Sequence, residues 1–417
     1  MSPSSARDPQ GTREATLSRK DWLVLPAVGV LAIVLLGICS ELIAKWALPA
    51  SSQGLSDCFA KDDPTGNATA KPNSVCSEQI AESPYTAEYR FDRYGHRAGM
   101  QLLSKAPDTY RIVMIGSSFA MGLFVPREMT FAALLPAELS KLTSRKIELY
   151  NEATGGKYRG GPFPTPGPPI QFNEALSADP DMILWIVTSN DFVTASPDIP
   201  APQVASEVVH ESDNQSTAAS SSWSRSNLLA ESEVLTEKIR NRFDQTRVAL
   251  LLKHLMLESE TQDQYVTSYL KNEDDAGFLR SEPGEKWQRL RQQFEMDAAQ
   301  YEGQAKAAGV PLVVVFVPNR AQAAMISMGR WPTGYDPYEL DKELRKIIES
   351  NGGTYIDVLD DYRTVPDPEQ NYFPVDGHPN SNGHAMITRF LTRELTSGAV
   401  PALRVTSSQQ MTMAQER

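Results

Sequence analysis

The chain has 417 residues, of which 41% are hydrophobic and 22% are charged, and its formal net charge at pH 7 is -12. The negative charge argues against a nucleic-acid or anionic-membrane partner, because both favour basic protein surfaces. The three cysteines and five histidines form no cluster with metal-ligand spacing, so we expect neither a metal site nor another cofactor.

Residues 22–44 are predicted to form a transmembrane helix, since Trp22 to Ser40 is almost entirely apolar and nearly long enough to cross a hydrocarbon core. Three basic residues precede this run: Arg13, Arg19 and Lys20. The positive-inside rule therefore places residues 1–21 in the cytoplasm as a tail and the rest of the chain outside. A cleaved signal peptide is the alternative, although it would have a shorter apolar core and small residues before the cut.

Residues 45–88 are rich in small and polar residues with little periodicity, which is typical of a stalk. Cys58 and Cys76 lie in this segment, and in an oxidising compartment they can close a disulfide across a polar loop. Two free thiols are the alternative.

Strands and helices alternate through residues 89–400, before a flexible tail at 401–417. Short apolar runs predict strands at Tyr110–Ile115, Ile147–Tyr150, Met182–Val187, Val310–Val317 and Thr354–Leu359. Helical spacing of apolar residues predicts helices at Thr130–Leu142, Trp287–Ala308, Tyr338–Ser350 and Ser381–Leu395. Such alternation predicts an α/β domain with a parallel sheet, helices on both faces, and ligands at the carboxyl ends of the strands.

Residues 196–284 interrupt the alternation with a connection far longer than usual. Its start is Pro-rich and Ser216 to Ser226 is nearly low in complexity, but Leu228 to Leu257 has helical apolar spacing. We interpret the segment as a helical insertion. It is either an extra packing layer or a lid or partner surface.

Ser118 is the candidate nucleophile. Gly116-Ser117-Ser118 directly follows the first predicted strand, where a turn exposes the hydroxyl and leaves backbone N–H groups free for an oxyanion. The plainer interpretation is a helix N-cap.

His378 is the candidate base, and Asp376 is the candidate group that orients it and stabilises its charged form. Taken alone, Asp376-Gly377-His378-Pro379 is a turn. His384 lies further along the last helix and is expected to pack or to support the site.

Two more polar positions fit an oxyanion hole together with the backbone N–H of Ser118. Asn190 follows the third strand and can offer its side-chain N–H, and Gly156 follows the second strand and can offer its backbone N–H. The alternative for Asn190-Asp191 is a simple turn.

The order Ser118, Gly156, Asn190, His378 resembles the four blocks of the SGNH/GDSL hydrolase superfamily, and the stretches Asp92 to Arg97 and Gly116 to Leu139 look most like its membrane-anchored bacterial members. The resemblance implies a three-layer flavodoxin-like fold, a Ser118–His378–Asp376 triad, and location in the bacterial inner membrane with a periplasmic domain. Three features depart from the family: Ser117 replaces an Asp, Thr188 replaces a Gly, and Asp376 lies two residues before His378 rather than three.

The resulting hypothesis is a membrane-anchored serine ester hydrolase that acts on acyl or acetyl esters in the cell envelope. An envelope-glycan O-acyltransferase is one alternative, because the same acyl-enzyme can pass its acyl group to a sugar hydroxyl. A non-catalytic glycan-binding or assembly protein that retains the fold is the other. The expected partners are an acyl-ester or acylated glycan and the inner membrane, while protein partners stay open.

Overall fold

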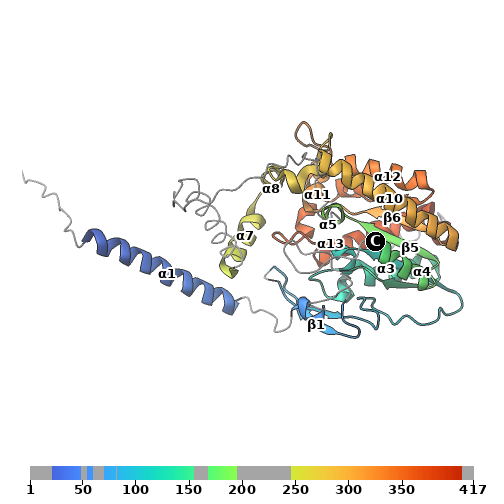
Figure 1. Ribbon diagram of the computed structural model, residues 1–417, viewed down its shortest axis with the longest axis horizontal. Coiled ribbons are helices and arrows are strands. Elements are labelled where there is room, and N and C mark those ends of the chain that lie inside the picture. The colour runs from blue at the N-terminus through green and yellow to red at the C-terminus, as the bar shows by residue number, and fades with distance from the viewer. Residues whose placement is uncertain are drawn as a thin grey trace, which may run out of the picture.

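The computed structural model describes residues 21–47, 54–59, 70–80, 82–154, 168–194 and 246–405. A long N-terminal helix stands away from a body in which a sheet lies between helices (Figure 1).

Five parallel strands form the central sheet in the order β4-β3-β5-β6-β7. They are β3 (Thr109–Gly116), β4 (Lys146–Asn151), β5 (Met182–Val187), β6 (Leu312–Phe316) and β7 (Thr354–Ile356). Every residue of β3 and of β5 is buried, as expected for strands that are covered on both faces. In the register, Ile112 lies beside Met182, and Ile183 lies beside Leu312.

This strand order is the flavodoxin-like order 2-1-3-4-5, so the predicted parallel α/β architecture is confirmed. The chain runs from β3 outward to β4 and then crosses back to β5, which makes the boundary between β3 and β5 the switch point of the sheet. Ligands bind at the carboxyl ends of strands at such a point.

Two groups of helices cover the sheet. On one face α3 (Phe131–Thr143) packs against α13 (Ser381–Glu394), and on the other α10 (Glu285–Ala308) packs between α4 (Pro168–Ser177) and α12 (Glu339–Asn351). Their apolar stripes explain the packing: α12, for example, buries Leu340, Leu344, Ile347 and Ile348.

Shorter elements complete the described body. The other helices of the body are α2 (Ser118–Met121), α5 (Ser189–Thr194), α7 (Arg247–Ser259), α8 (Gln262–Tyr269), α9 (Glu273–Ala276) and α11 (Arg320–Met328). Single turns of tighter or wider helix occupy Leu55–Cys58, Arg127–Met129, Gly277–Leu279, Leu359–Thr364, Pro368–Asn371, Leu395–Ala399 and Pro401–Leu403. The helical insertion is therefore seen as α7 to α9, while residues 196–245 lie outside the described residues.

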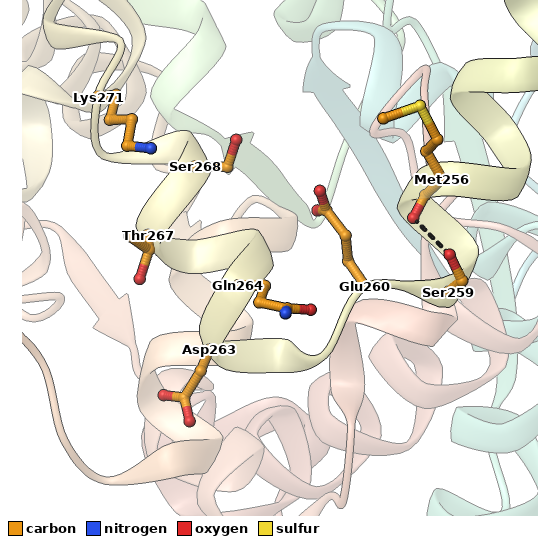
Figure 2. Close-up of a pocket in the computed structure, with 8 residues that line it drawn as sticks. All are labelled: Met256, Ser259, Glu260, Asp263, Gln264, Thr267, Ser268 and Lys271. Carbon is orange, nitrogen blue, oxygen red and sulfur yellow. Dashed lines mark hydrogen bonds between the residues drawn. The ribbon is translucent and has the colours of Figure 1, made fainter. Parts of the chain in front are cut away.

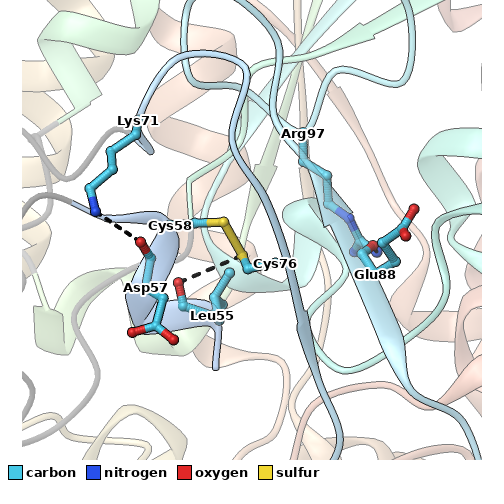
Figure 3. The surroundings of a disulfide bond; sticks show 7 residues. All are labelled: Leu55, Asp57, Cys58, Lys71, Cys76, Glu88 and Arg97. Atoms are coloured by element: carbon cyan, nitrogen blue, oxygen red, sulfur yellow. Dashed lines mark hydrogen bonds between the residues drawn. A yellow bond between two sulfur atoms is a disulfide. The ribbon is translucent and has the colours of Figure 1, made fainter. Parts of the chain in front are cut away.

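The segment before β3 forms a small antiparallel hairpin, β1 (Val75–Glu78) with β2 (Ala87–Arg90). The predicted disulfide joins Cys58 to Cys76, whose Cα atoms are 6.0 Å apart, and it fastens the turn at Leu55–Cys58 to β1 (Figure 3). Tyr89 is fully buried in the same core as the sheet. Residues 54–59, 70–80 and 82–88 thus lie against the α/β body, and the predicted domain boundaries stay predictions.

The N-terminal helix is α1 (Asp21–Ala47), and its stretch Pro26–Ala44 is long and apolar enough to cross a membrane. It is the one such helix among the described residues, and a signal sequence would pass the same test. Its end contacts the insertion, because the backbone N–H of Val248 in α7 donates to the carboxylate of Glu41 at 3.3 Å.

Candidate active site

The turn after β3 is shaped by two glycines. Gly116 has φ +150°, and a Cβ there would lie 2.7 Å from the carbonyl oxygen of Ile186. Gly122 ends α2 at φ +76°, where a Cβ would lie 2.4 Å from Thr130 Cγ2. Because only glycine fits both positions, the chain can leave the strand sharply and begin α2 at Ser118.

Ser118, His378 and Asp376 are brought together at the carboxyl edge of the sheet. The Ser118 hydroxyl lies 2.7 Å from Nε2 of His378, which is 260 residues away in the chain. The other ring nitrogen, Nδ1, donates to Oδ1 of Asp376 at 2.6 Å. Ser118 is 8% exposed, and the side chains of His378 and Asp376 are 13% and 18% exposed. Such a chain of contacts allows an imidazole to take a proton from a hydroxyl while a carboxylate holds its other ring nitrogen.

The loop that carries His378 is closed by its own backbone. The N–H of Phe373 donates to the carbonyl of His378 at 2.8 Å, and the N–H of Gly377 donates to the carbonyl of Phe373 at 2.9 Å. The backbone N–H of His378 also donates to Asp376 Oδ1 at 3.1 Å. After the loop, Asn380 caps α13 by accepting two backbone N–H groups. The short Asp-to-His spacing is therefore compatible with a direct contact between the two side chains.

Two phenylalanine rings flank the imidazole. The centroids of Phe119 and Phe124 lie 5.1 Å and 5.7 Å from that of His378. Nearby in β1, burial and then the charge of Asp376 raise the pKa of Glu78. The apolar rings limit water around the imidazole, which strengthens its interaction with Asp376.

A buried arginine holds the loop after α2, a role that no sequence pattern indicated. The Arg97 guanidinium donates to the carbonyls of Met121, Gly122, Val125 and Glu88 at 2.6 to 3.2 Å. Burial lowers its pKa to about 10. The same loop places Phe124 at φ +63°, where the hydroxyl of Tyr89 accepts its backbone N–H at 2.8 Å. These contacts fix the ring that lies against His378.

Of the predicted oxyanion-hole residues beyond Ser118, the structure describes Asn190 but not Gly156. Asn190 lies in α5, directly after β5, and is exposed. Its neighbour Asp191 accepts the backbone N–H and the hydroxyl of Thr188. Burial raises the pKa of Asp191, and the hydrogen bonds from Thr188 oppose this shift. Gly156 lies outside the described residues.

The histidine within α13, His384, is a packing residue. His384 is buried, its Nδ1 accepts the backbone N–H of Phe131 at 3.3 Å, and the two rings lie 5.2 Å apart. Burial, with the charges of Arg97 and His378 as smaller causes, lowers the pKa of His384 to about 3. It is therefore neutral at neutral pH and does not act as a second base.

A second buried polar cluster lies beside the end of β4. Burial, followed by the charges of Glu174 and Asp92, raises the pKa of Glu152 to about 9. His96 places Nδ1 3.3 Å from the hydroxyl of Tyr150, and its Nε2 lies 3.3 Å from Glu174 Oε2. The described residues contain no group of His, Cys, Asp and Glu side chains that could hold a metal ion.

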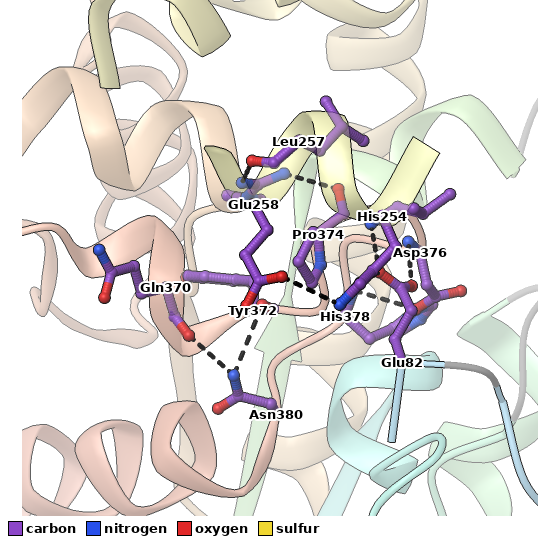
Figure 4. A network of polar contacts seen from close by, with 12 residues as sticks. Glu82, His254, Leu257, Glu258, Gln370, Tyr372, Pro374, Asp376, His378 and Asn380 are labelled. Atoms are coloured by element: carbon purple, nitrogen blue, oxygen red, sulfur yellow. Dashed lines mark hydrogen bonds and ion pairs between the residues drawn. The ribbon is translucent and has the colours of Figure 1, made fainter. Parts of the chain in front are cut away.

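Glu82 contacts the loop that carries Asp376, and no sequence pattern predicted this contact. It accepts the backbone N–H groups of Val375 and Asp376 and also lies beside His254 (Figure 4). A lone glutamate in a segment without periodicity carries no local signal of such a contact.

Two surface hollows, each of about 620 Å³, lie away from the triad. One is open and lies along α7 and α8, where polar side chains such as Gln264 and Lys271 line it (Figure 2). The other lies beside β2, between Tyr85 and Arg127. None of the triad residues lines either hollow.

No protein-family model and no curated protein matches the chain. Among solved structures, it is similar to a variant of an acetyl-xylooligosaccharide esterase from Geobacillus, at 11% identity over 69% of this chain and 94% of the other, with a TM-score of 0.36. A lipase/acylhydrolase from Enterococcus faecalis matches at 11% identity over 69% and 95% of the chains, with a TM-score of 0.34. A protein from Slackia heliotrinireducens assigned to the SGNH hydrolases matches at 12% identity over 69% and 100%, with a TM-score of 0.30.

All three TM-scores lie below 0.5, and the parallel α/β fold follows instead from the strand order of the sheet.

Proposed function

We propose that the protein is a serine ester hydrolase of the SGNH/GDSL type, with Ser118 as nucleophile, His378 as base and Asp376 as the orienting carboxylate. One observation carries the proposal: the continuous Asp376–His378–Ser118 hydrogen-bond chain, with links of 2.6 and 2.7 Å. A non-catalytic protein that retained the fold would not need these three side chains within hydrogen-bond distance of one another.

The reaction proceeds in two halves. Ser118 Oγ attacks the ester carbonyl carbon while its proton passes to His378 Nε2, and the proton then passes to the leaving alcohol oxygen as the C–O bond breaks. In the second half His378 takes a proton from water as the water oxygen attacks the acyl carbon, and His378 then returns the proton to Ser118 Oγ as the bond between that oxygen and the acyl carbon breaks and the carboxylic acid leaves. Asp376 stays ionised and stabilises the imidazolium throughout.

The oxyanion hole would consist of the backbone N–H groups of Ser118 and Gly156 and the side-chain N–H of Asn190. The position of Ser118 at the first residue of α2 supports this, because the first N–H groups of a helix have no partner within the helix. Asn190 fits as it follows β5, the strand next to β3.

The proposed setting is the periplasmic face of a bacterial inner membrane, with α1 as a single-pass anchor. The apolar stretch of α1, the basic residues before it and the disulfide support this setting. The substrates would then be acyl or acetyl esters of the cell envelope.

The test is labelling of the full-length protein in detergent with a fluorophosphonate probe. We expect wild type to label, and Ser118→Ala and His378→Ala to abolish labelling, with the adduct mapped to Ser118 by mass spectrometry. Ser177→Ala is the control, because Ser177 is an exposed serine on α4. A folded wild type that does not label would contradict the proposal.

Hydrolysis and acyl transfer differ in the acceptor. A chromogenic acetyl ester is turned over with and without added oligosaccharide, and acetylated sugar is measured. Free acetate in both cases supports the hydrolase. If added oligosaccharide lowers the release of free acetate and acetylated oligosaccharide forms instead, the protein is an acyltransferase.

A further inference from the structure

Glu82 lies at the meeting point of three segments that are far apart in the chain. Its Oε1 accepts the backbone N–H of Val375 at 2.7 Å, and its Oε2 accepts that of Asp376 at 2.9 Å. Nδ1 of His254, in α7, lies 3.1 Å from the same Oε1. Figure 4 shows Glu82 next to Asp376 and His378, with His254 approaching from above.

We propose that Glu82 is a positioning residue of the triad, which holds the backbone of the Asp376 loop, and that His254 in turn holds Glu82. The inference rests on the proposed function, since it assigns Glu82 a part in that same reaction.

The contacts of Glu82 are of the kind that fixes a loop. Its side chain is 7% exposed, and each carboxylate oxygen takes one backbone N–H of two consecutive residues. Charge-assisted hydrogen bonds of this bidentate form are stronger and more directional than neutral ones. The carboxylate thus sets the position of the Asp376 backbone, from which the Asp376 side chain reaches His378.

Ser83, the residue after Glu82, contacts the loop that follows the nucleophile. The hydroxyl of Ser83, which is buried, donates to the carbonyl of Phe124 at 3.4 Å, and the ring of Phe124 lies against His378. Two consecutive residues, which the sequence placed in a stalk, therefore contact both the loop after the nucleophile and the loop of the base.

The negative charge of the Glu82 carboxylate contributes to the site as well as its hydrogen bonds. A second carboxylate beside Asp376 makes the local potential more negative, which stabilises the imidazolium that forms when Ser118 attacks. His254 limits the cost of burying this charge by approaching Oε1, and it lies 3.4 Å from the exposed Glu258 on its other side.

The experiment uses the full-length protein and the substitution Glu82→Gln. The amide has one oxygen, so its NH₂ group faces one of the two backbone N–H donors and leaves that donor without an acceptor. Glu88→Gln is the matched control, because Glu88 is an exposed glutamate of the same hairpin whose carboxylate contacts Arg90. Three quantities are measured for each variant: the fluorophosphonate labelling rate, kcat and KM for a chromogenic acetyl ester, and the downfield N–H resonance of His378.

We expect Glu82→Gln to lower kcat and the labelling rate by about 10-fold to 100-fold, since a small misplacement of a catalytic group has effects of this size. KM should stay close to the wild-type value, and the His378 resonance should shift or broaden. His254→Ala removes one of the three contacts of Glu82 and leaves both backbone N–H donors in place, so it should lower the labelling rate only about threefold. Glu88→Gln should behave as wild type.

Two results would overturn the inference. One is a folded Glu82→Gln variant that labels at the wild-type rate. The other is a slower rate that follows only from a smaller folded fraction, with the His378 resonance unchanged in the folded molecules. If the proposed function itself were wrong, wild type would fail to label, so the two failures are distinguishable.

Discussion

Replacement of Asp376 by asparagine tests the triad most directly. The amide side chain would keep the size and the loop contacts of the carboxylate but remove its charge. It would also permit the wrong His378 tautomer, because the amide can present an NH₂ group to Nδ1. The backbone N–H of residue 376 would still donate to Glu82.

The magnitude follows from the contact itself. Asp376 and His378 lie 2.6 Å apart at Oδ1 and Nδ1, with both side chains mostly buried. Two unit charges about 4 Å apart in a medium of effective dielectric about 20 attract by about 4 kcal/mol. Loss of that attraction in the transition state corresponds to about 1,000-fold in rate, since about 1.4 kcal/mol is tenfold.

The assay is the rate of fluorophosphonate labelling at fixed pH, compared among wild type, Asp376→Asn and a control. Asp360→Asn is the control, since Asp360 is an exposed aspartate paired with Arg363. We expect labelling by Asp376→Asn to be about 1,000-fold slower and that by Asp360→Asn to be unchanged. A folded Asp376→Asn variant within about tenfold of wild type would refute the role of Asp376.

Three further predictions concern groups around the site. Arg97→Lys should lower the free energy of unfolding by about 2–6 kcal/mol in denaturant titrations. One ammonium group leaves at least two buried carbonyls without donors, and each costs about 1–3 kcal/mol. An unchanged unfolding midpoint would contradict this. The Cys58→Ser, Cys76→Ser double variant should lose about 3 kcal/mol in the same assay, the loop-closure value for a separation of 18 residues; equal stability with oxidised wild type would exclude that contribution. Burial raises the pKa of Glu152 to about 9 from its ordinary 4.5, so between these pH values the unfolded chain releases a proton that the folded chain keeps, and stability falls as pH rises. Glu152→Gln should therefore flatten the pH dependence of Tm across this window, and a slope equal to that of wild type would show that the folded carboxyl is ionised.

Local sequence patterns determined the sheet and the ends of its strands. Met182–Val187 is predicted and observed with the same bounds, and the other strands and long helices of the core differ by a few residues, because runs of buried apolar side chains are a local property of the chain. Since parallel strands share a carboxyl edge, Ser118 and His378 could be placed near each other before any distance was known.

The tertiary structure alone decided which polar groups support the site. Glu82 contacts Asp376 across 294 residues, and Arg97 holds carbonyls up to 28 residues away, yet neither lies in a pattern that marks it. A periodic pattern specifies which face of an element is buried. The partner of a single polar side chain depends instead on how distant loops close, and that is fixed only when the whole chain has packed.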